Sequence, residues 1–470
     1  MRKIHKIVLV MAGLAAFVTA EAQTVSPVDF MRMNPYQLKA NPATDLPYVS
    51  VMSLLVGNTG VNLQNTSLRY NNLFDFDAQG RPTTMNLRQF ANSVKENNFM
   101  GVDANVELFT LYRRLGKGTK GLLTIDYGIK VHSDAKINDD AFKLLGYGNS
   151  AFVGDDNPAH VSMDVNAQAF QELAVGYQWN VNDHLSLGGR AKLLFGVLDV
   201  TTDVIDAKLY TDPDSYALRA EEDIAVRMAM PRAVYVKDGM LKTDGPFKVA
   251  QLFRNPGFGI DFGAEYRFND KFSAVAAVHD LGFVYWGLND INMKGQIHDA
   301  GQFYDDGGFL FNGMDVDQLQ RIFSDDEYRE LFLDTLQQYF QLEFTPMKSY
   351  TTMLKTNLLL RGNYDLDAHN RFSLQAQGRF LGSGFRPAVT LAYNGYFYNK
   401  LDVCVTYTVM PGSYDNIGLG ISGRLFKTCV VYLTTNNVIG MFSPLNLSGM
   451  DVRAGIVFVL RPEDKNNEYD

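Results

Sequence analysis

The chain has 470 residues, of which 46% are hydrophobic and 20% charged, and its formal net charge is −9. This composition is apolar enough for a folded core but too charged for a bundle of membrane-spanning helices. Nucleic-acid-binding proteins usually carry a net positive charge, whereas this chain is negatively charged, so no nucleic acid is expected as a partner. No Pro-rich or Gly/Ser-rich linker interrupts the sequence, which favours one continuous domain over two or three.

Residues 1–22 have the pattern of an export signal. A basic start is followed by an apolar stretch over residues 7–18 and by Ala20-Glu21-Ala22, a small-x-small cleavage site. The apolar stretch is shorter than the roughly 20 residues that a spanning helix needs. We therefore predict a cleaved signal peptide and an exported mature protein.

Residues 23–47 differ from everything that follows because they are rich in proline. Four prolines, Pro27, Pro35, Pro42 and Pro47, fall in this short segment. Proline cannot donate a hydrogen bond to a sheet ladder, so the segment is not expected to be a strand. It is predicted to be a plug, or hatch, inside a wide barrel that would otherwise have an empty interior.

From residue 48 onward, apolar and polar residues alternate in many segments. In residues 371–380, for example, Phe372, Leu374 and Phe380 share one face while Ser373 and Gln375 lie on the other. A period of two indicates β-strands with one dry and one wet face. The segments are roughly ten residues long, which is the length that a tilted strand needs to cross a membrane.

The joints between these segments distinguish a membrane barrel from a soluble sandwich. Six joints are short and polar: 116–120, 180–184, 269–271, 365–370, 398–400 and 425–427. The connections on the other side include four long ones, 58–100, 132–166, 200–257 and 286–349. This asymmetry is typical of the periplasmic and extracellular sides of an outer-membrane barrel.

Six hairpins with one further strand at each end predict an antiparallel transmembrane β-barrel of 14 strands over residues 48–460, followed by a polar periplasmic tail at 461–470. Residues 201–209 and 216–229 could form another hairpin, and counting it would give 16 strands. Aromatic residues gather beside the short joints, as expected for an interfacial girdle. They are Tyr112, Tyr177, Trp179, Tyr266, Phe268, Phe272, Tyr364, Phe372, Phe397 and Phe426.

The wet faces carry charges of both signs. A ring of one sign would indicate ion selectivity, whereas mixed signs favour ion pairs that brace a wide wall. The charges expected to face the lumen are Asp126, Lys130, Arg190, Lys192, Asp261, Glu265, Arg267, Arg361 and Arg379.

Residues 315–342 are predicted to form a helical insertion in the longest loop. Asp315 with Gln318 and Ser324 with Glu327 match the capping-box pattern at two helix starts. The second helix would have an apolar face that either packs as the core of a lid or forms a groove that catches ligand. That face consists of Tyr328, Leu331, Phe332, Leu336, Tyr339 and Phe340.

The histidines are scattered over loops and turns, and none has the spacing of metal ligands. His279-Asp280 is a pair near a predicted wall strand, but no serine or second acid can be placed in register with it. We therefore expect no enzyme activity, no catalytic or metal site and no cofactor.

Asn34-Pro35 and Asn41-Pro42-Ala43, placed after an export signal and before a 14-strand pattern, resemble the FadL-like superfamily of long-chain fatty-acid transporters in the outer membrane. Within the superfamily, the closer resemblance is to uncharacterised relatives from Bacteroidetes-type bacteria. The resemblance implies that Asn41, Pro42 and Ala43 belong to a hatch that closes the lumen.

The resemblance also implies a function: uptake or binding of hydrophobic small molecules at the outer membrane, through loop capture, a lumen pocket and movement of the hatch. The alternative is a non-transporting barrel that acts in secretion, assembly or attachment of exported proteins. The expected partners are outer-membrane lipid and either a hydrophobic small molecule or an exported protein.

Overall fold

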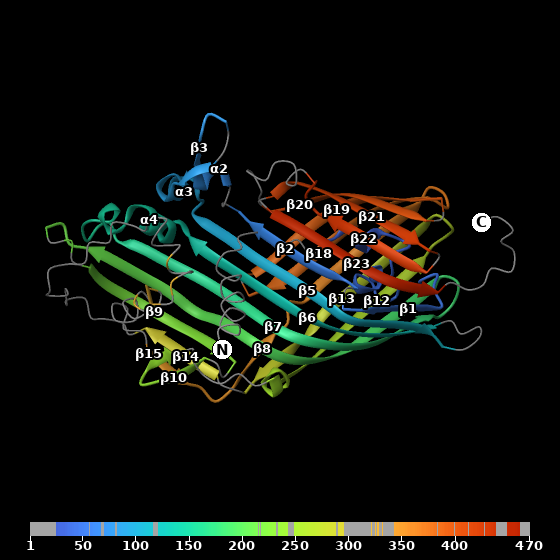
Figure 1. Ribbon diagram of the computed structural model, residues 1–470, viewed down its shortest axis with the longest axis horizontal. Coiled ribbons are helices and arrows are strands. Elements are labelled where there is room, and N and C mark those ends of the chain that lie inside the picture. Colours follow the sequence, from blue (N-terminus) through green and yellow to red (C-terminus); the bar gives the residue numbers. More distant parts are fainter. Residues whose placement is uncertain are drawn as a thin grey trace.

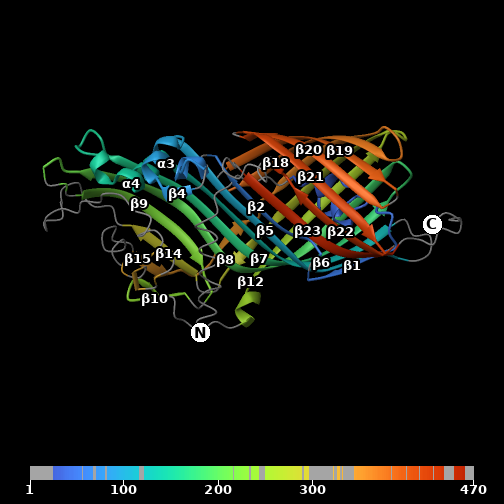
Figure 2. The same ribbon diagram turned by 45° about the horizontal axis from the view of Figure 1, so that its top comes forward.

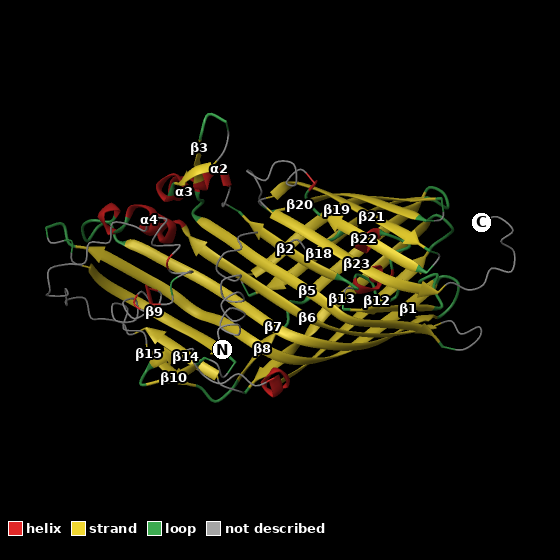
Figure 3. Ribbon diagram, viewed as in Figure 1, coloured by secondary structure: helices red, strands yellow, loops and turns green. Residues whose placement is uncertain are grey.

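A computed structural model of the chain shows a closed antiparallel β-barrel of 14 strands (Figures 1 and 3). The structure describes residues 25–460 except 56, 67–69, 80–81, 116–120, 215, 217, 232–233, 243–248, 288–289, 296–320, 322–324, 326, 329–330, 332–342, 383, 399, 412, 427 and 439–448. The predicted signal peptide and C-terminal tail lie outside the described residues.

The ring has 14 strand positions. Two of these positions are each occupied by two short strands that follow one another in the chain. The strands are β1 (Ser50–Leu54) with β2 (Thr59–Asn65), β5 (Asn97–Arg114), β6 (Gly121–Asn138), β7 (Ala159–Asn180), β8 (Leu185–Thr211), β12 (Asn255–Arg267), β13 (Phe272–Trp286), β16 (Tyr350–Met353) with β17 (Asn357–Asp365), β18 (Asn370–Leu381), β19 (Gly384–Phe397), β20 (Leu401–Met410), β21 (Ser413–Leu425), β22 (Cys429–Thr435) and β23 (Gly449–Leu460). The ring closes at β1, where Ser50 lies opposite both Arg113 of β5 and Leu460 of β23.

The short joints lie where the alternation predicts them, and the strand count of 14 is confirmed. The strands β5 to β8 are longer than expected, at 18, 18, 22 and 27 residues, because they continue past the ring on the long-loop side. This continuation, which we call the extension, includes β9 (Leu218–Ala229), β14 (Asp290–Gly295) and β15 (Glu343–Pro346), with the hairpin β10 (Tyr235–Lys237) and β11 (Met240–Lys242) (Figure 2).

The extension begins where β8 changes its neighbour. Below this point β8 pairs with β12, up to Gly196 opposite Asn255, and above it β8 pairs with β9 from Asp199 onward. The sheet therefore splits between β8 and β12. The hairpin over residues 201–229 belongs to the extension, so the alternative of 16 wall strands is wrong.

The remaining elements cover the long-loop end. They are α2 (Tyr70–Leu73), β3 (Phe74–Phe76), β4 (Pro82–Met85), α3 (Leu87–Ser93), α4 (Asp139–Tyr147), η3 (Asn149–Ala151) and η4 (Val249–Phe253). Phe90 of α3 and Phe142 of α4 pack edge to face with ring centroids 5.4 Å apart, which fixes these two helices together. Most of the predicted helical insertion at 315–342 lies outside the described residues.

The outer face of the ring is apolar. Large side chains that would be buried in a soluble protein are exposed there, and they form the surface that hydrocarbon covers. They include Leu193, Phe258, Phe262, Leu281, Phe283, Leu358, Leu360, Leu374, Val389, Leu391, Ile421, Leu433, Ile456 and Phe458. Among the described residues, no helix has the length and apolarity to cross a membrane.

Most of the predicted aromatic girdle points outward beside the short joints, including Tyr177, Trp179, Tyr266 and Phe272. Tyr112 is the exception. It is buried in the lumen, where its hydroxyl donates to Asp126 Oδ1 at 3.0 Å. A β-bulge between Glu107 and Phe109 shifts the alternation by one residue and reverses the two faces of β5 beyond it.

Candidate functional site: a plugged lumen

The N-terminal segment Val25–Pro47, which we call the plug, lies inside the half of the barrel that carries the short joints (Figures 1 and 3). Two short 3-10 helices organise it, η1 (Pro27–Phe30) and η2 (Pro35–Lys39). Both begin with a proline, whose fixed φ angle suits the first helical turn. The plug therefore occupies the lumen at this level.

Apolar contacts hold the plug against the wall. Tyr36, Leu38 and Leu46 of the plug are at most 3% exposed and pack in one cluster with wall residues such as Leu122 and Val457. Burial of apolar side chains contributes roughly 1.5 to 3 kcal/mol each. The plug is thus a folded part of the barrel interior.

The Asn41-Pro42-Ala43 motif forms a tight turn against the wall. The Asn41 side chain accepts a hydrogen bond from the Ala43 amide at 3.0 Å and donates one to Glu265 Oε2 at 3.3 Å. Two wall glycines face the turn, and a Cβ on Gly188 or Gly263 would lie 1.9 Å from the Pro42 carbonyl oxygen or 2.5 Å from Asn41 Oδ1. Only glycine allows this close approach.

Polar contacts tie the plug to the wall at several points. Arg32 pairs with Asp365 at 3.2 Å, and Asp45 pairs with Arg114. The His279 ring donates through Nε2 to the Ala40 carbonyl oxygen at 2.9 Å. These contacts, distributed around the ring, fix the orientation of the plug as well as its position.

Lys39 is the plug residue that enters the charged part of the lumen. Its Nζ lies 3.0 Å from Glu107 Oε1 and 2.8 Å from Asp126 Oδ1. Asp126 also accepts from Arg190 at 2.7 Å, so the plug lysine joins a set of ion pairs that the wall supplies. Sequence reasoning missed Lys39, because nothing in the sequence shows that a lone lysine of the plug meets two wall acids.

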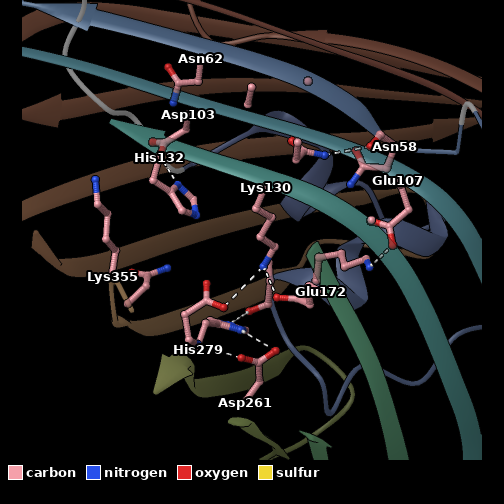
Figure 4. Close-up of a pocket in the computed structure, with 18 of the residues that line it drawn as sticks. Asn58, Asn62, Asp103, Glu107, Lys130, His132, Glu172, Asp261, His279 and Lys355 are labelled. Atoms are coloured by element: carbon pink, nitrogen blue, oxygen red, sulfur yellow. Dashed lines mark hydrogen bonds and ion pairs between the residues drawn. The ribbon is translucent and has the colours of Figure 1, made fainter. Parts of the chain in front are cut away.

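We call this set of ion pairs the lumen network; it extends across β5, β6, β7, β8, β12 and β13. Lys192 Nζ lies 2.6 Å from Asp261 Oδ1 and 2.5 Å from Asp280 Oδ1, and Lys130 Nζ lies 2.7 Å from Glu172 Oε2. Figure 4 shows Lys130, Glu172, Asp261 and His279 converging on one point of the lumen. The members are Lys39, Glu107, Asp126, Lys130, Glu172, Arg190, Lys192, Asp261 and Asp280.

A second buried group lies beside the network. Arg379 makes a two-pronged ion pair with Asp103, at 2.6 Å and 2.9 Å, and His132 contacts the same carboxylate. Lys355 pairs with Asp134. Charges of both signs are matched here, which is consistent with bracing of the wall.

The network lines a cavity of about 190 Å³ above the plug, and Asn58, Asn62 and Arg453 also line it. Figure 4 shows Asn58 and Asn62 across the cavity from His279 and Asp261. Its described lining carries cations and carboxylates that are already paired with each other. An apolar molecule would offer these charged groups no replacement partner if it separated them.

A cavity of about 620 Å³ lies on the other side of the plug, at the short-joint end. Three predicted lumen charges line it: Glu265, Arg267 and Arg361. Arg361 is buried, and it donates to Gln375 Oε1 and to the carbonyl oxygen of plug residue Asp29, both at 2.8 Å. Burial also raises the pKa of the Asp29 carboxyl above its ordinary value.

Apolar side chains gather above the network. A buried cluster, which we call the apolar cluster, lies at the split between β8 and β12 and consists of Phe170, Leu194, Ala229, Val284, Trp286, Tyr350 and Leu354. Trp286 is fully buried, and its ring lies over Gly196, where a Cβ would be 2.3 Å from the ring. The Trp286 indole donates to Thr352 Oγ1 at 2.8 Å.

The proposed apolar groove of the loop helix cannot be placed. Tyr328 and Leu331 are described, and Leu331 is 65% exposed. Phe332, Leu336, Tyr339 and Phe340 lie outside the described residues, so both interpretations of this face stay predictions.

A closed ring of 14 antiparallel strands, apolar outside and filled by its own N-terminal segment, defines a plugged transmembrane barrel of the outer-membrane type. The chain belongs to DUF5723, a family of unknown function, whose model matches residues 42–436. A comparison with curated proteins gives no match.

Several solved outer-membrane channels are similar in shape. The Pseudomonas putida toluene transporter TodX shares 8% identity over 90% of this chain and 92% of that chain, with a TM-score of 0.38. The TodX deltaS2S3 mutant, a monoaromatic hydrocarbon channel, shares 9% over 95% and 96%, with a TM-score of 0.42. A Pseudomonas aeruginosa FadL homologue shares 11% over 89% and 91%, with a TM-score of 0.38. Similarities at this level do not establish a shared function.

Proposed function

We propose that this protein is a conduit for hydrophobic small molecules in the outer membrane, and that the solute leaves the lumen sideways at the split between β8 and β12. The proposal rests on the contrast between two parts of the lumen. The plug and the lumen network stand across the axial path, whereas a buried cluster of apolar side chains lies beside the split.

The axial path is unsuitable for an apolar solute. Beyond the apolar cluster such a molecule would meet Lys192, Asp261 and Asp280, whose ion pairs are buried and short. Breaking a buried ion pair by removing one partner costs about 3 to 5 kcal/mol. An apolar solute supplies no replacement for the lost partner, so passage through the network is opposed.

The split offers a different exit. Pairing between β12 and β13 ends at Gly257 opposite Val284, so the last residues of β13 have no partner on the β12 side. Trp286 occupies this place, between the lumen and the gap in the ladder, and stacks on Tyr350 with ring centroids 6.4 Å apart. The single observation that carries the proposal is this large ring, held over Gly196 at the discontinuity of the wall. Rotation of the ring would connect the apolar cluster to the hydrocarbon outside.

The resemblance of Asn41-Pro42-Ala43 to the hatch of FadL-like transporters, among them the Bacteroidetes-type relatives, supports the same function. The proposed location is therefore the outer membrane, after removal of residues 1–22. In this proposal the plug keeps water and ions from passing while the apolar solute uses the side exit.

The test compares uptake of N-phenyl-1-naphthylamine, an apolar dye, by cells that carry wild-type protein, Trp286→Ala or no protein. We expect wild type to exceed the empty cells and Trp286→Ala to exceed wild type several-fold, because the obstruction is removed. Trp179→Ala is the matched control, since this other tryptophan is 50% exposed on the outer face. Equal uptake in all strains, at equal amounts of folded barrel, would refute the proposal.

A second measurement separates the two routes. Deleting residues 24–45 should admit a small polar dye and leave the apolar dye unchanged, because only the axial path is opened. If the deletion instead raises apolar uptake more than Trp286→Ala does, the side exit is wrong and the solute follows the axis.

A further inference from the structure

A row of side chains crosses the base of the extension, one from each of four neighbouring strands. Gln168 of β7 lies opposite Asp199 of β8, Asp199 lies opposite Ala229 of β9, and Ala229 lies opposite Asp290 of β14. Residues directly opposite one another in a sheet project from the same face. All four side chains are buried, with exposures of 6%, 1%, 1% and 3% in this order.

The oxygen atoms in this row exceed the donors available to them. Both carboxylate oxygens of Asp290 and the amide oxygen of Gln168 are buried and have no hydrogen-bond partner among the described residues. Asp199 accepts from Tyr350 at 2.8 Å, from Thr201 at 2.9 Å and from the Gln168 amide nitrogen at 3.2 Å. The row thus presents unpartnered acceptors beside a carboxylate whose hydrogen-bond donors are all neutral groups.

Arg227 is close enough to Asp199 to act on it electrostatically, but it is engaged elsewhere. Its guanidinium donates to Asp203 at 2.6 to 3.1 Å and lies over the Tyr350 ring, 5.1 Å from the centroid. Asp290 therefore has no ion pair of its own within the described part of the chain. A buried carboxylate without partners is destabilising.

The spacing leaves room for an ion. Neighbouring strands are about 4.8 Å apart, so Asp199 and Asp290 start about 10 Å apart with only the methyl group of Ala229 between them. A Ca²⁺ ion binds oxygen at about 2.3 to 2.6 Å, so an ion held by both carboxylates requires the two side chains to lean toward each other until their oxygens are about 5 Å apart.

We propose that Asp199 and Asp290 bind a divalent cation of the calcium type at the base of the extension, with water completing the coordination. The ligand set consists of oxygen alone, which favours Ca²⁺ over Zn²⁺. The sequence analysis predicted no metal site, because these ligands come from different strands and no histidine takes part. The bound ion links β14 to β8 and so fastens the extension to the wall.

The probe is Tb³⁺, which occupies calcium sites and emits when nearby aromatic rings are excited. Tyr350 contacts Asp199 directly and stacks on Trp286, so excitation of these rings should sensitise a bound ion. Full-length protein in detergent at pH 7.5 should show saturable Tb³⁺ emission that Ca²⁺ displaces. Asp290→Asn should reduce the emission at least tenfold, whereas Asp223→Asn, an exposed acid of β9, should leave it unchanged.

Thermal unfolding supplies the second measurement. Millimolar Ca²⁺ should raise the melting temperature of the wild type and of Asp223→Asn, and it should have no effect on Asp290→Asn. Absence of sensitised emission in the wild type, or equal emission from Asp290→Asn, would overturn the proposal. If Asp290→Asn does not fold, an unchanged melting temperature of the wild type with and without Ca²⁺ would overturn it equally.

Discussion

Gly188 of β8 touches Pro42 of the plug so closely that a Cβ on Gly188 would lie 1.9 Å from the Pro42 carbonyl oxygen. This contact is between two backbones, so a larger side chain cannot be accommodated by rotation of a flexible group. The seat of the plug therefore depends on a wall residue that carries no charge and makes no hydrogen bond through a side chain.

Gly188→Val should displace the plug while leaving the ring closed. We expect a several-fold rise in single-channel conductance in planar bilayers, since the axial path then opens. Gly362→Val is the matched control, because no atom lies within 4 Å of a Cβ at that position. Unchanged conductance of Gly188→Val would show that the Asn41-Pro42-Ala43 turn does not close the lumen.

Lys39→Met should weaken the docking of the plug. The substitution keeps the aliphatic chain and removes the ion pairs with Glu107 and Asp126. Hydrogen bonds to charged groups contribute about 1.5 to 3 kcal/mol, so the fraction of time with the plug released should rise about tenfold or more. Cleavage of the plug by an added protease measures this, with Lys271→Met in an exposed turn as control. Equal cleavage rates would contradict the assigned role.

Arg379→Met should destabilise the barrel without opening it. The two-pronged ion pair with Asp103 is buried, and losing one partner leaves the carboxylate beside His132 alone. The expected loss in free energy of unfolding is about 3 kcal/mol. Urea titration of the refolded barrel in lipid measures it, and Arg254→Met, an exposed residue, should change little. A loss below that of the control would show that the pair is not stabilising.

Asp29→Asn should change how plug release depends on pH. Burial raises the pKa of the Asp29 carboxyl, so its protonated form favours the docked plug and this contribution is lost as pH rises through the raised pKa. Asparagine cannot ionise, so the variant should release its plug less than the wild type at pH 7.5, with the difference vanishing in acid. The measurement is the rate at which protease cleaves the plug, from pH 7.5 down into the acid range. If the difference in cleavage between the variant and the wild type grows in acid, the protonated form of Asp29 does not favour the docked plug.

The ring could be predicted from the sequence because alternation and joint length are local properties. Residues 371–380 show this, since Leu374 is 58% exposed to the outside and Gln375 is fully buried, as their alternation requires. Bulges are not visible in the pattern. The bulge after Glu107 turned Tyr112 inward, and a second irregularity between Ile260 and Phe262 lets both His279 and Asp280 face the lumen.

The site was accessible to sequence reasoning only in part. The proline content of residues 23–47 identified the plug segment, and the alternation identified acids and bases such as Asp126 and Arg190. Their partners depend on register between strands far apart in the chain, which the sequence does not contain. For this reason the sequence did not predict the contact of Lys39 with Glu107. It did not predict the row through Gln168, Asp199 and Asp290 either.

One strand, β8, carries almost every feature that matters for passage. Gly188 seats the plug, Arg190 and Lys192 enter the lumen network, Gly196 lies under Trp286, and Asp199 stands in the oxygen row. At about 3.3 Å per residue, these positions span roughly 36 Å along one strand. A shift of β8 along its own axis would therefore displace Asp199, Gly196 and Gly188 by the same distance. The oxygen row, the side exit and the contact with the plug would change together.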